Sequence, residues 1–133
     1  MSTSHKNILK GAKTILLVDW PNPDVPKSLL NAGFTVFGYS PDKYSAIEQG
    51  DNGELVFMKL DVNPVSVDIV NVYRPEEEHP AIINNRVLPL KAKVLWLQPP
   101  VMSANTAVLA SKHGLVFIEG SDIAEVARTI SSG

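Results

Sequence analysis

Short apolar runs alternate with helical patterns along most of this chain of 133 residues. The two clearest runs occupy residues 67–72 and 94–97, and each ends abruptly in polar residues. Runs of this length, rich in β-branched residues and too apolar for a half-exposed strand, are typical of parallel strands covered by helices on both faces. The pattern therefore predicts an α/β domain with a mainly parallel, doubly wound sheet of five to six strands.

The other elements follow from the same periodicity and from residues that cap helices. The predicted strands cover residues 14–19, 34–39, 55–58, 67–72, 94–97 and 115–118. The first predicted helix covers residues 26–32, and a second begins at residues 75–78, where three glutamates follow a proline. A third runs from its cap at Ser103 to about residue 112, and a fourth runs from its cap at Asp122 to about residue 130. Between residue 41 and the turn at 50–53 we expect irregular chain, and we expect the weak strand 55–58 at an edge of the sheet.

A single domain is predicted over residues 14–133, preceded by residues 1–13 as a tail or short helix that ends at Gly11. Since parallel strands bind ligands in the crevice outside their carboxyl ends, the residues that follow each strand are the candidate site.

Composition narrows the function classes. Twelve basic and 14 acidic side chains give a net charge of −2 with no long basic block, which argues against a nucleic-acid partner. The chain has no cysteine, so disulfides, thiolate catalysis and cysteine-based metal centres are excluded. The polar N-terminal residues lack the apolar region of a signal peptide, and no stretch approaches the length of a membrane span. We expect a soluble, cytoplasmic protein with no membrane partner.

Several segments carry a family resemblance that covers nearly the whole chain. They are residues 8–10, 13–15, 29–37, 40–41, 67–75, 92–98 and 114–116, of which 92–98 is the best match. Together they resemble the small CoA-binding domain proteins, which are stand-alone Rossmann-like domains similar to the N-terminal domain of the succinyl-CoA ligase α-subunit. The resemblance implies a sheet order near 3-2-1-4-5 and CoA or a related nucleotide bound across the strand ends.

The loop after the first strand departs from this family. Family members usually have small residues there, so that backbone N–H groups approach the pyrophosphate. Here residues 19–26 contain no glycine, three prolines without N–H donors and two carboxylates. After the fifth strand, Gln98 is followed by Pro99 and Pro100 where the family often has a glycine. We expect weak anion binding at the first loop.

The candidate ligand-binding residues follow the first, second, fourth and fifth predicted strands. They are Asp19, Trp20, Pro21, Asn22, Ser40, Pro41, Arg74 and Gln98. Arg74 is the candidate anion ligand, because its fork of donors matches a phosphate or carboxylate; the alternative is a surface pair with a glutamate at 76–78. Asp19 is expected to accept backbone N–H groups of its turn, and Ser40 and Gln98 either line the crevice or satisfy loop backbone.

Trp20 has two interpretations: it stacks on an adenine, or it fills the old phosphate site. We expect the indole to pack against the rim at Pro99 and Pro100, or to meet a neighbouring chain. The three histidines lack metal-binding spacing and are expected to be solvated. No serine lies in a Gly-x-Ser-x-Gly elbow, which disfavours a serine hydrolase.

Two functions remain. The first is a non-catalytic module that binds CoA, acyl-CoA or an adenine nucleotide. The second is a degenerate family member that has lost the phosphate cradle and acts as a protein-interaction or regulatory domain, as a homo-oligomer whose contact surface joins residues 20–21 to residues 99–102. An oxidoreductase is the weakest reading, because the Gly-x-Gly-x-x-Gly fingerprint is missing.

Overall fold

The computed structural model describes residues 4–40 and 42–131. The strands are β1 (Thr14–Val18), β2 (Thr35–Tyr39), β3 (Tyr44–Gln49), β4 (Leu55–Lys59), β5 (Ile69–Val72), β6 (Val94–Leu97) and β7 (Val116–Ile118). The helical elements are α1 (His5–Lys10), α2 (Asp24–Asn31), η1 (Glu76–Glu78), α3 (His79–Ile82), η2 (Ile83–Val87), α4 (Ala104–Lys112) and α5 (Ile123–Ser131).

Within these residues the strands form one seven-stranded sheet in the order β4-β3-β2-β1-β5-β6-β7. All neighbours from β2 to β7 through β1 are parallel, whereas β3 and β4 form an antiparallel hairpin beside β2. The predicted α/β class and doubly wound, mainly parallel sheet are confirmed, and so is the position of residues 55–58 at an edge.

The prediction of irregular chain after residue 41 was wrong, because residues 44–49 form β3. As a result the sheet has more strands than predicted, and β4 lies one position farther out than the order 3-2-1-4-5 implies. Only Tyr44 and Ile47 of β3 are buried, so the strand lacks the apolar run that identifies a strand in sequence. Its pairing on both sides supplies the stability that the sequence pattern does not show.

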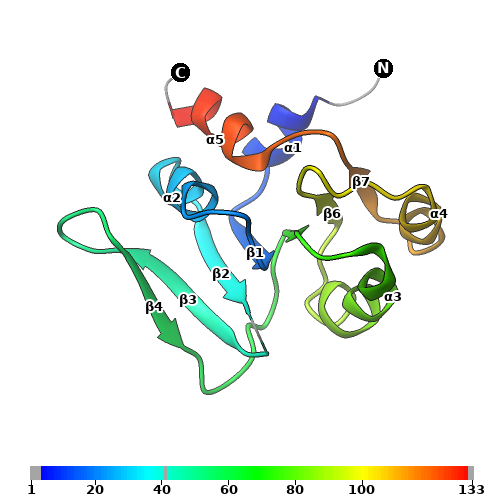
Figure 1. The fold of residues 1–133 in the computed structure, drawn as a ribbon, viewed down its shortest axis with the longest axis horizontal. Coiled ribbons are helices and arrows are strands. Elements are labelled where there is room, and N and C mark those ends of the chain that lie inside the picture. Colours follow the sequence, from blue (N-terminus) through cyan, green and yellow to red (C-terminus); the bar gives the residue numbers. More distant parts are fainter. Residues whose placement is uncertain (1–3, 41, 132–133) are drawn as a thin grey trace.

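Helices cover both faces of the sheet. In Figure 1, α1, α2 and α5 lie on one side, and α3 and α4 lie on the other. Successive residues of β1 point to opposite faces, so Ile15 and Leu17 join the core beneath α2 and α5, while Leu16 and Val18 join the core beneath α3. Both faces of the central strands are therefore buried, which explains their continuous apolar runs.

Several predicted helix boundaries are confirmed. The Ser103 hydroxyl accepts the Thr106 N–H at 3.0 Å and so caps α4, and Gly114 beyond that helix has a φ of 70°. The short helix predicted before the first strand is α1, and Leu9 from it is fully buried. Helix α2 begins earlier than predicted, at Asp24, whose N–H is bound by the Asn22 side chain.

The segment after β5 decides the shape of the candidate site. It is not one regular helix but a 3-10 turn, a short α-helix and a π-helical turn in succession. Ile82, Ile83 and Val87 anchor this segment to the sheet, so its polar side chains project over the carboxyl ends of β1 and β2. Across the two described ranges, no helix is long and apolar enough to cross a bilayer.

Candidate functional site at the carboxyl ends of the strands

A pocket of about 460 Å³ lies where β1, β2 and β5 end beneath α3 and η2. It is lined by Val18, Asp19, Tyr39, Ser40, Arg74, Glu77, Glu78, Ala81, Ile82, Asn85 and Arg86. Three of the residues singled out in the sequence, Asp19, Ser40 and Arg74, therefore meet at one place. They meet because the carboxyl ends of neighbouring parallel strands share one edge of the sheet.

Asp19 organises the start of the pocket. Its φ of 64° lies in the left-handed region, which aspartate tolerates better than most residues. One carboxylate oxygen accepts the Trp20 N–H at 3.0 Å and the Ser40 hydroxyl at 3.5 Å, and the other accepts from Arg74 Nη1 at 3.0 Å. Asp19 thus accepts a backbone N–H of its own turn, as expected, and also joins two strand ends.

Arg74 is held by carboxylates from two sides. Its Nε and Nη2 donate to the two oxygens of Glu78 at 3.0 and 2.7 Å, while Nη1 donates to Asp19. The hydrogen bonds to Glu78 and then to Asp19 raise the pKa of Arg74, and the bonds from Arg74 lower the pKa of Glu78. The pair with a glutamate, which was the alternative for Arg74, is present in the structure, and Arg74 also lines the pocket. Its role as an anion ligand stays a prediction.

Arg86 is a pocket residue that the sequence reading missed. Its guanidinium carbon lies 3.9 Å from the Tyr39 ring centroid and 5.5 Å from that of Tyr44, and it donates hydrogen bonds to the Tyr39 hydroxyl and the Asn85 carbonyl. Burial raises the pKa of Tyr44, while the charge of Arg86 opposes that rise. Among residues 4–40 and 42–131, Arg86 forms no ion pair with a carboxylate.

The sequence could have indicated Arg86 only if its basic side chain had been considered together with the place of its segment in the fold. The segment after β5 begins at the crevice end of the sheet, so a basic residue within it was a candidate for the pocket. Because the segment contains a π-helical turn, the side of the helix on which residue 86 lies does not follow from a regular 3.6-residue period.

His79 was expected to be solvated, and this was wrong. The side chain is 1% exposed, with Nδ1 2.7 Å from the Thr106 hydroxyl and Nε2 2.8 Å from the Arg74 carbonyl. It therefore connects α4 to the end of β5 and fixes the backbone of the residue that lines the pocket. No group of ligating side chains suited to a metal occurs in the part of the chain that the structure describes.

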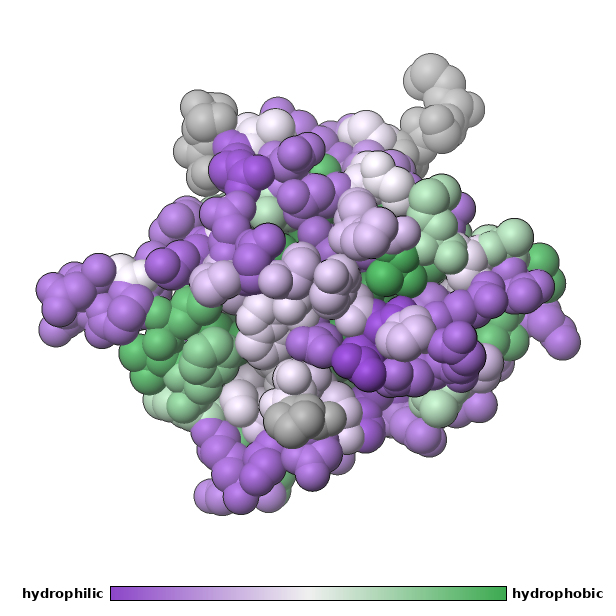
Figure 2. All heavy atoms as spheres, viewed as in Figure 1, coloured by the Kyte–Doolittle hydropathy of each residue, from purple (hydrophilic) through white to green (hydrophobic). Residues whose placement is uncertain are grey.

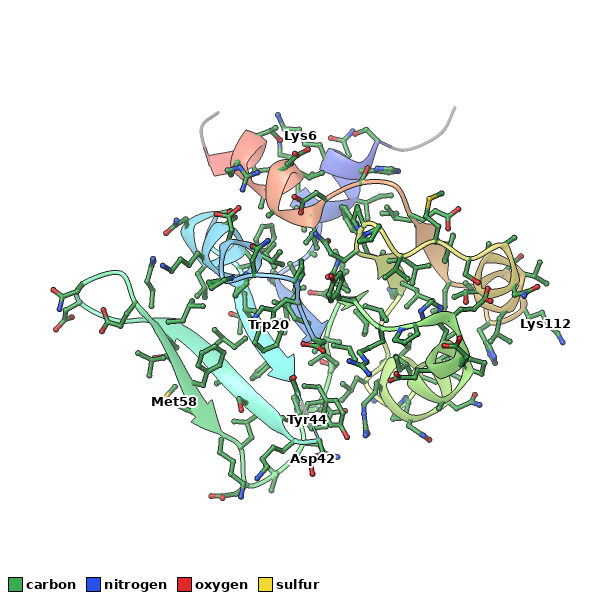
Figure 3. The ribbon with its side chains drawn as sticks, viewed as in Figure 1. Lys6, Trp20, Asp42, Tyr44, Met58 and Lys112 are labelled. Atoms are coloured by element: carbon green, nitrogen blue, oxygen red, sulfur yellow. The ribbon has the colours of Figure 1, made fainter. Side chains whose placement is uncertain are left out.

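Trp20 does not line this pocket, nor does it lie against Pro99 and Pro100. Its ring stacks on Phe57 of β4, with centroids 5.9 Å apart and planes 7° from parallel, and it lies over Gly38 of β2. Figure 3 labels Trp20 on the hairpin side of the molecule. The two prolines follow β6, on the other side of β1, so the predicted contact was wrong.

The remaining candidates are dispersed. Pro21 and Asn22 are exposed. Gln98 is buried, where it accepts from the Asn71 amide and the Ile123 N–H and donates to Asp122. Gln98 thus satisfies the start of α5, which was the alternative considered for it. Pro41 lies outside the described residues.

Three backbone N–H groups between Asp19 and Val25 have partners within the same segment. The Trp20 N–H binds Asp19, the Asp24 N–H binds the Asn22 side chain, and the Val25 N–H binds the Asn22 carbonyl. The α2 terminus is preceded by Pro23, without a side-chain cap. The positive charges that line the pocket are the two arginines, and the carboxylates of residues 19, 77 and 78 line it as well.

Comparison with known proteins agrees with this architecture. The model of the CoA binding domain family matches residues 18–124, which include every residue that lines the pocket. A structure titled cell-free ID.343 from Thermus thermophilus aligns with a TM-score of 0.70 at 21% identity, over 94% of this chain and 95% of that one.

Two archaeal structures give the same result. A hypothetical protein from Pyrococcus horikoshii aligns with a TM-score of 0.65 at 17% identity, over 94% of this chain and 88% of its own. A conserved hypothetical protein from Pyrococcus furiosus aligns with a TM-score of 0.58 at 23% identity, over 85% and 97%. At these identities the structures establish a shared fold.

Proposed function

Since this chain belongs to the CoA-binding domain family, we propose that it binds CoA or a related adenine nucleotide, without catalysing a reaction, in the pocket beneath α3 and η2. The observation that carries the proposal is the convergence of Asp19, Ser40 and Arg74 from three strand ends on one cavity that Arg86 also lines. A volume of about 460 Å³ falls in the ordinary range for small-molecule sites.

The two arginines have different parts in this proposal. Arg86 has no carboxylate partner among the described residues, so its charge is available to a phosphate while Tyr39 holds the guanidinium in place. Arg74 binds a phosphate through the edge that Glu78 now occupies, so ligand binding requires the Arg74–Glu78 pair to open. Ser40 offers a hydroxyl to the ribose.

A second hollow gives room for the rest of a long ligand. It has a volume of about 270 Å³ and is lined by Asp19, Tyr73, Arg74, Pro75, Pro100 and Val101. It shares Asp19 and Arg74 with the main pocket, so a chain that extends from a nucleotide would cross over this ion pair. This arrangement matches a ligand laid across the carboxyl ends of β1 and β5, the point where strand order reverses.

The test is isothermal calorimetry with CoA, ADP and adenosine on wild-type protein and on Arg74→Ala. We expect weak binding of CoA and ADP, poorer binding of adenosine, and a loss of about 1.5–3 kcal/mol in Arg74→Ala, typical of a hydrogen bond to a charged group. Lys10→Ala is the matched control, because Lys10 is exposed on α1, which lies on the other side of the sheet from α3 (Figure 1). Absence of heat and of thermal stabilisation at millimolar CoA and ADP would refute the proposal.

One observation favours the alternative of a degenerate member that acts as an interaction or regulatory domain. The Trp20 and Asp24 N–H groups are bound by side chains of the β1–α2 segment, and Arg74 is neutralised by two carboxylates at 3.0 and 2.7 Å. If calorimetry detects no binding of CoA or ADP, the interaction or regulatory domain becomes the better proposal.

A further inference from the structure

The outer edge of β4 presents backbone groups without a neighbouring strand in the described residues. Strand β4 pairs only with β3. The Glu54 carbonyl accepts the Gly50 N–H at 2.7 Å, and the Leu60 N–H donates to the Tyr44 carbonyl at 3.1 Å, so the backbone groups of even-numbered residues face β3. Because the direction alternates along an antiparallel strand, the N–H and C=O groups of Leu55, Phe57 and Lys59 face outward.

The same strand exposes apolar side chains on both faces of the sheet. Val56, Phe57 and Met58 are 38%, 49% and 42% exposed. Figure 2 shows hydrophobic surface gathered at the lower left, where Figure 1 places β4. Phe57 lies on the Trp20 side, so Val56 and Met58 lie on the opposite face. An extended apolar edge of this kind is a template for another strand.

We propose that β4 pairs with β4 of a second copy of this chain, antiparallel and about a two-fold axis at Phe57. The proposal is independent of nucleotide binding. In this register Phe57 lies opposite Phe57 and Leu55 opposite Lys59, so all three outward-facing residues exchange backbone bonds, on the order of six in total. The sheets of both copies would become one continuous sheet.

The distribution of residues along the strand identifies a second copy as the partner. Four apolar residues, Leu55–Met58, are flanked by Glu54 and Lys59, and antiparallel self-pairing places the apolar centre of one strand on that of the other. Lys59 faces the aliphatic Leu55 and not its own copy, so no like charges are directly opposed. The arrangement also matches the isologous contact of a two-fold dimer.

The proposed contact between the two copies is small, so we expect a weak dimer. One short strand pair buries less than the roughly 1,600 Å² of a standard interface, so we expect a dissociation constant on the order of tens of micromolar. Sedimentation velocity from about 5 to 500 µM should therefore show wild-type protein passing from monomer to dimer.

Two variants test the location of the contact. Met58→Lys places a charge in the apolar centre, and Lys59→Pro removes an outward N–H while leaving the inward bonds to β3 intact. Each should weaken dimerisation at least tenfold while circular dichroism stays unchanged. The matched control is Val108→Lys, which alters a valine 64% exposed on α4 and should leave the dimer as in wild type.

A third variant tests the register. The chain has no cysteine, so Phe57→Cys can form a disulfide only between copies. Residues directly opposite in a hydrogen-bonded pair have Cα atoms about 5.5 Å apart, within the range for a disulfide. Phe57→Cys should cross-link much faster than Val108→Cys. A wild-type protein that stays monomeric at 500 µM, a dimer that tolerates Met58→Lys and Lys59→Pro, or equal cross-linking rates would each overturn the proposal.

Discussion

Glu78→Gln should strengthen the binding of CoA or ADP, although Arg74→Ala should weaken it and the two side chains form one ion pair. Glu78 occupies Nε and Nη2 of Arg74 at 3.0 and 2.7 Å, which is the edge that a phosphate would bind in a bidentate manner. Removing the charge of Glu78 therefore weakens its hold on this edge and also removes repulsion from the pocket.

The size of the effect follows from Coulomb's law. If the displaced carboxylate of Glu78 stays about 5 Å from a phosphate on Arg74, the two like charges repel by about 0.8 kcal/mol at a dielectric constant of 80 and about 3 kcal/mol at 20. The side chains of Arg74 and Glu78 are 40% and 44% exposed, which favours the lower value. We expect a gain of about 1 kcal/mol, or roughly fivefold in affinity.

The assay is calorimetry at about 20 and 300 mM salt. Salt screens the repulsion between the phosphate and Glu78, but it does not change how far the edge of Arg74 is available for hydrogen bonds. Glu77→Gln is the matched control: Glu77 also lines the pocket, but Arg74 donates its hydrogen bonds to Glu78 and Asp19. Its effect should be smaller and should vanish at high salt, whereas that of Glu78→Gln should persist in part. If Glu78→Gln binds no better than wild type while Arg74→Ala binds worse, the ligand does not use the edge that Glu78 occupies.

Three further outcomes are expected from the structure. Ser103→Ala removes the cap of α4 and should cost about 1 kcal/mol of unfolding free energy in urea titrations; an unchanged midpoint would contradict the capping role. Gly38→Ala adds a methyl group 2.9 Å from Ile47 and 3.0 Å from the Trp20 ring, so it should cost about 1–3 kcal/mol, and Trp20→Leu should relieve part of that cost in the double variant. Bonding to Arg74 lowers the pKa of Glu78 from 4.5, so its stabilisation is complete above that value and is lost as the pH falls through the folded-state pKa; Glu78→Gln should flatten this part of the acid unfolding curve by less than about 1 kcal/mol.

The sequence alone determined the central architecture and the place of the candidate site. Strands such as β5 and β6 are buried on both faces, so their apolar runs are unambiguous, and residues that cap helices mark the boundaries between elements. Parallel strands with helical crossovers bring their carboxyl ends to one edge, so Asp19, Ser40 and Arg74 could be grouped without coordinates.

Other features depend on contacts between residues far apart in the chain, and only the tertiary structure decided them. Strand β3 is held by its neighbours, and its own sequence pattern is weak. His79 became a buried connector because α4 packs against α3 and offers the Thr106 hydroxyl. Arg86 lines the pocket because it lies in a π-helical turn, which no regular sequence period predicts. Trp20 stacks on Phe57 of β4, a residue far from it in the chain. Local sequence fixes the direction of a strand end, but the partner of each side chain depends on which distant surface packs against it.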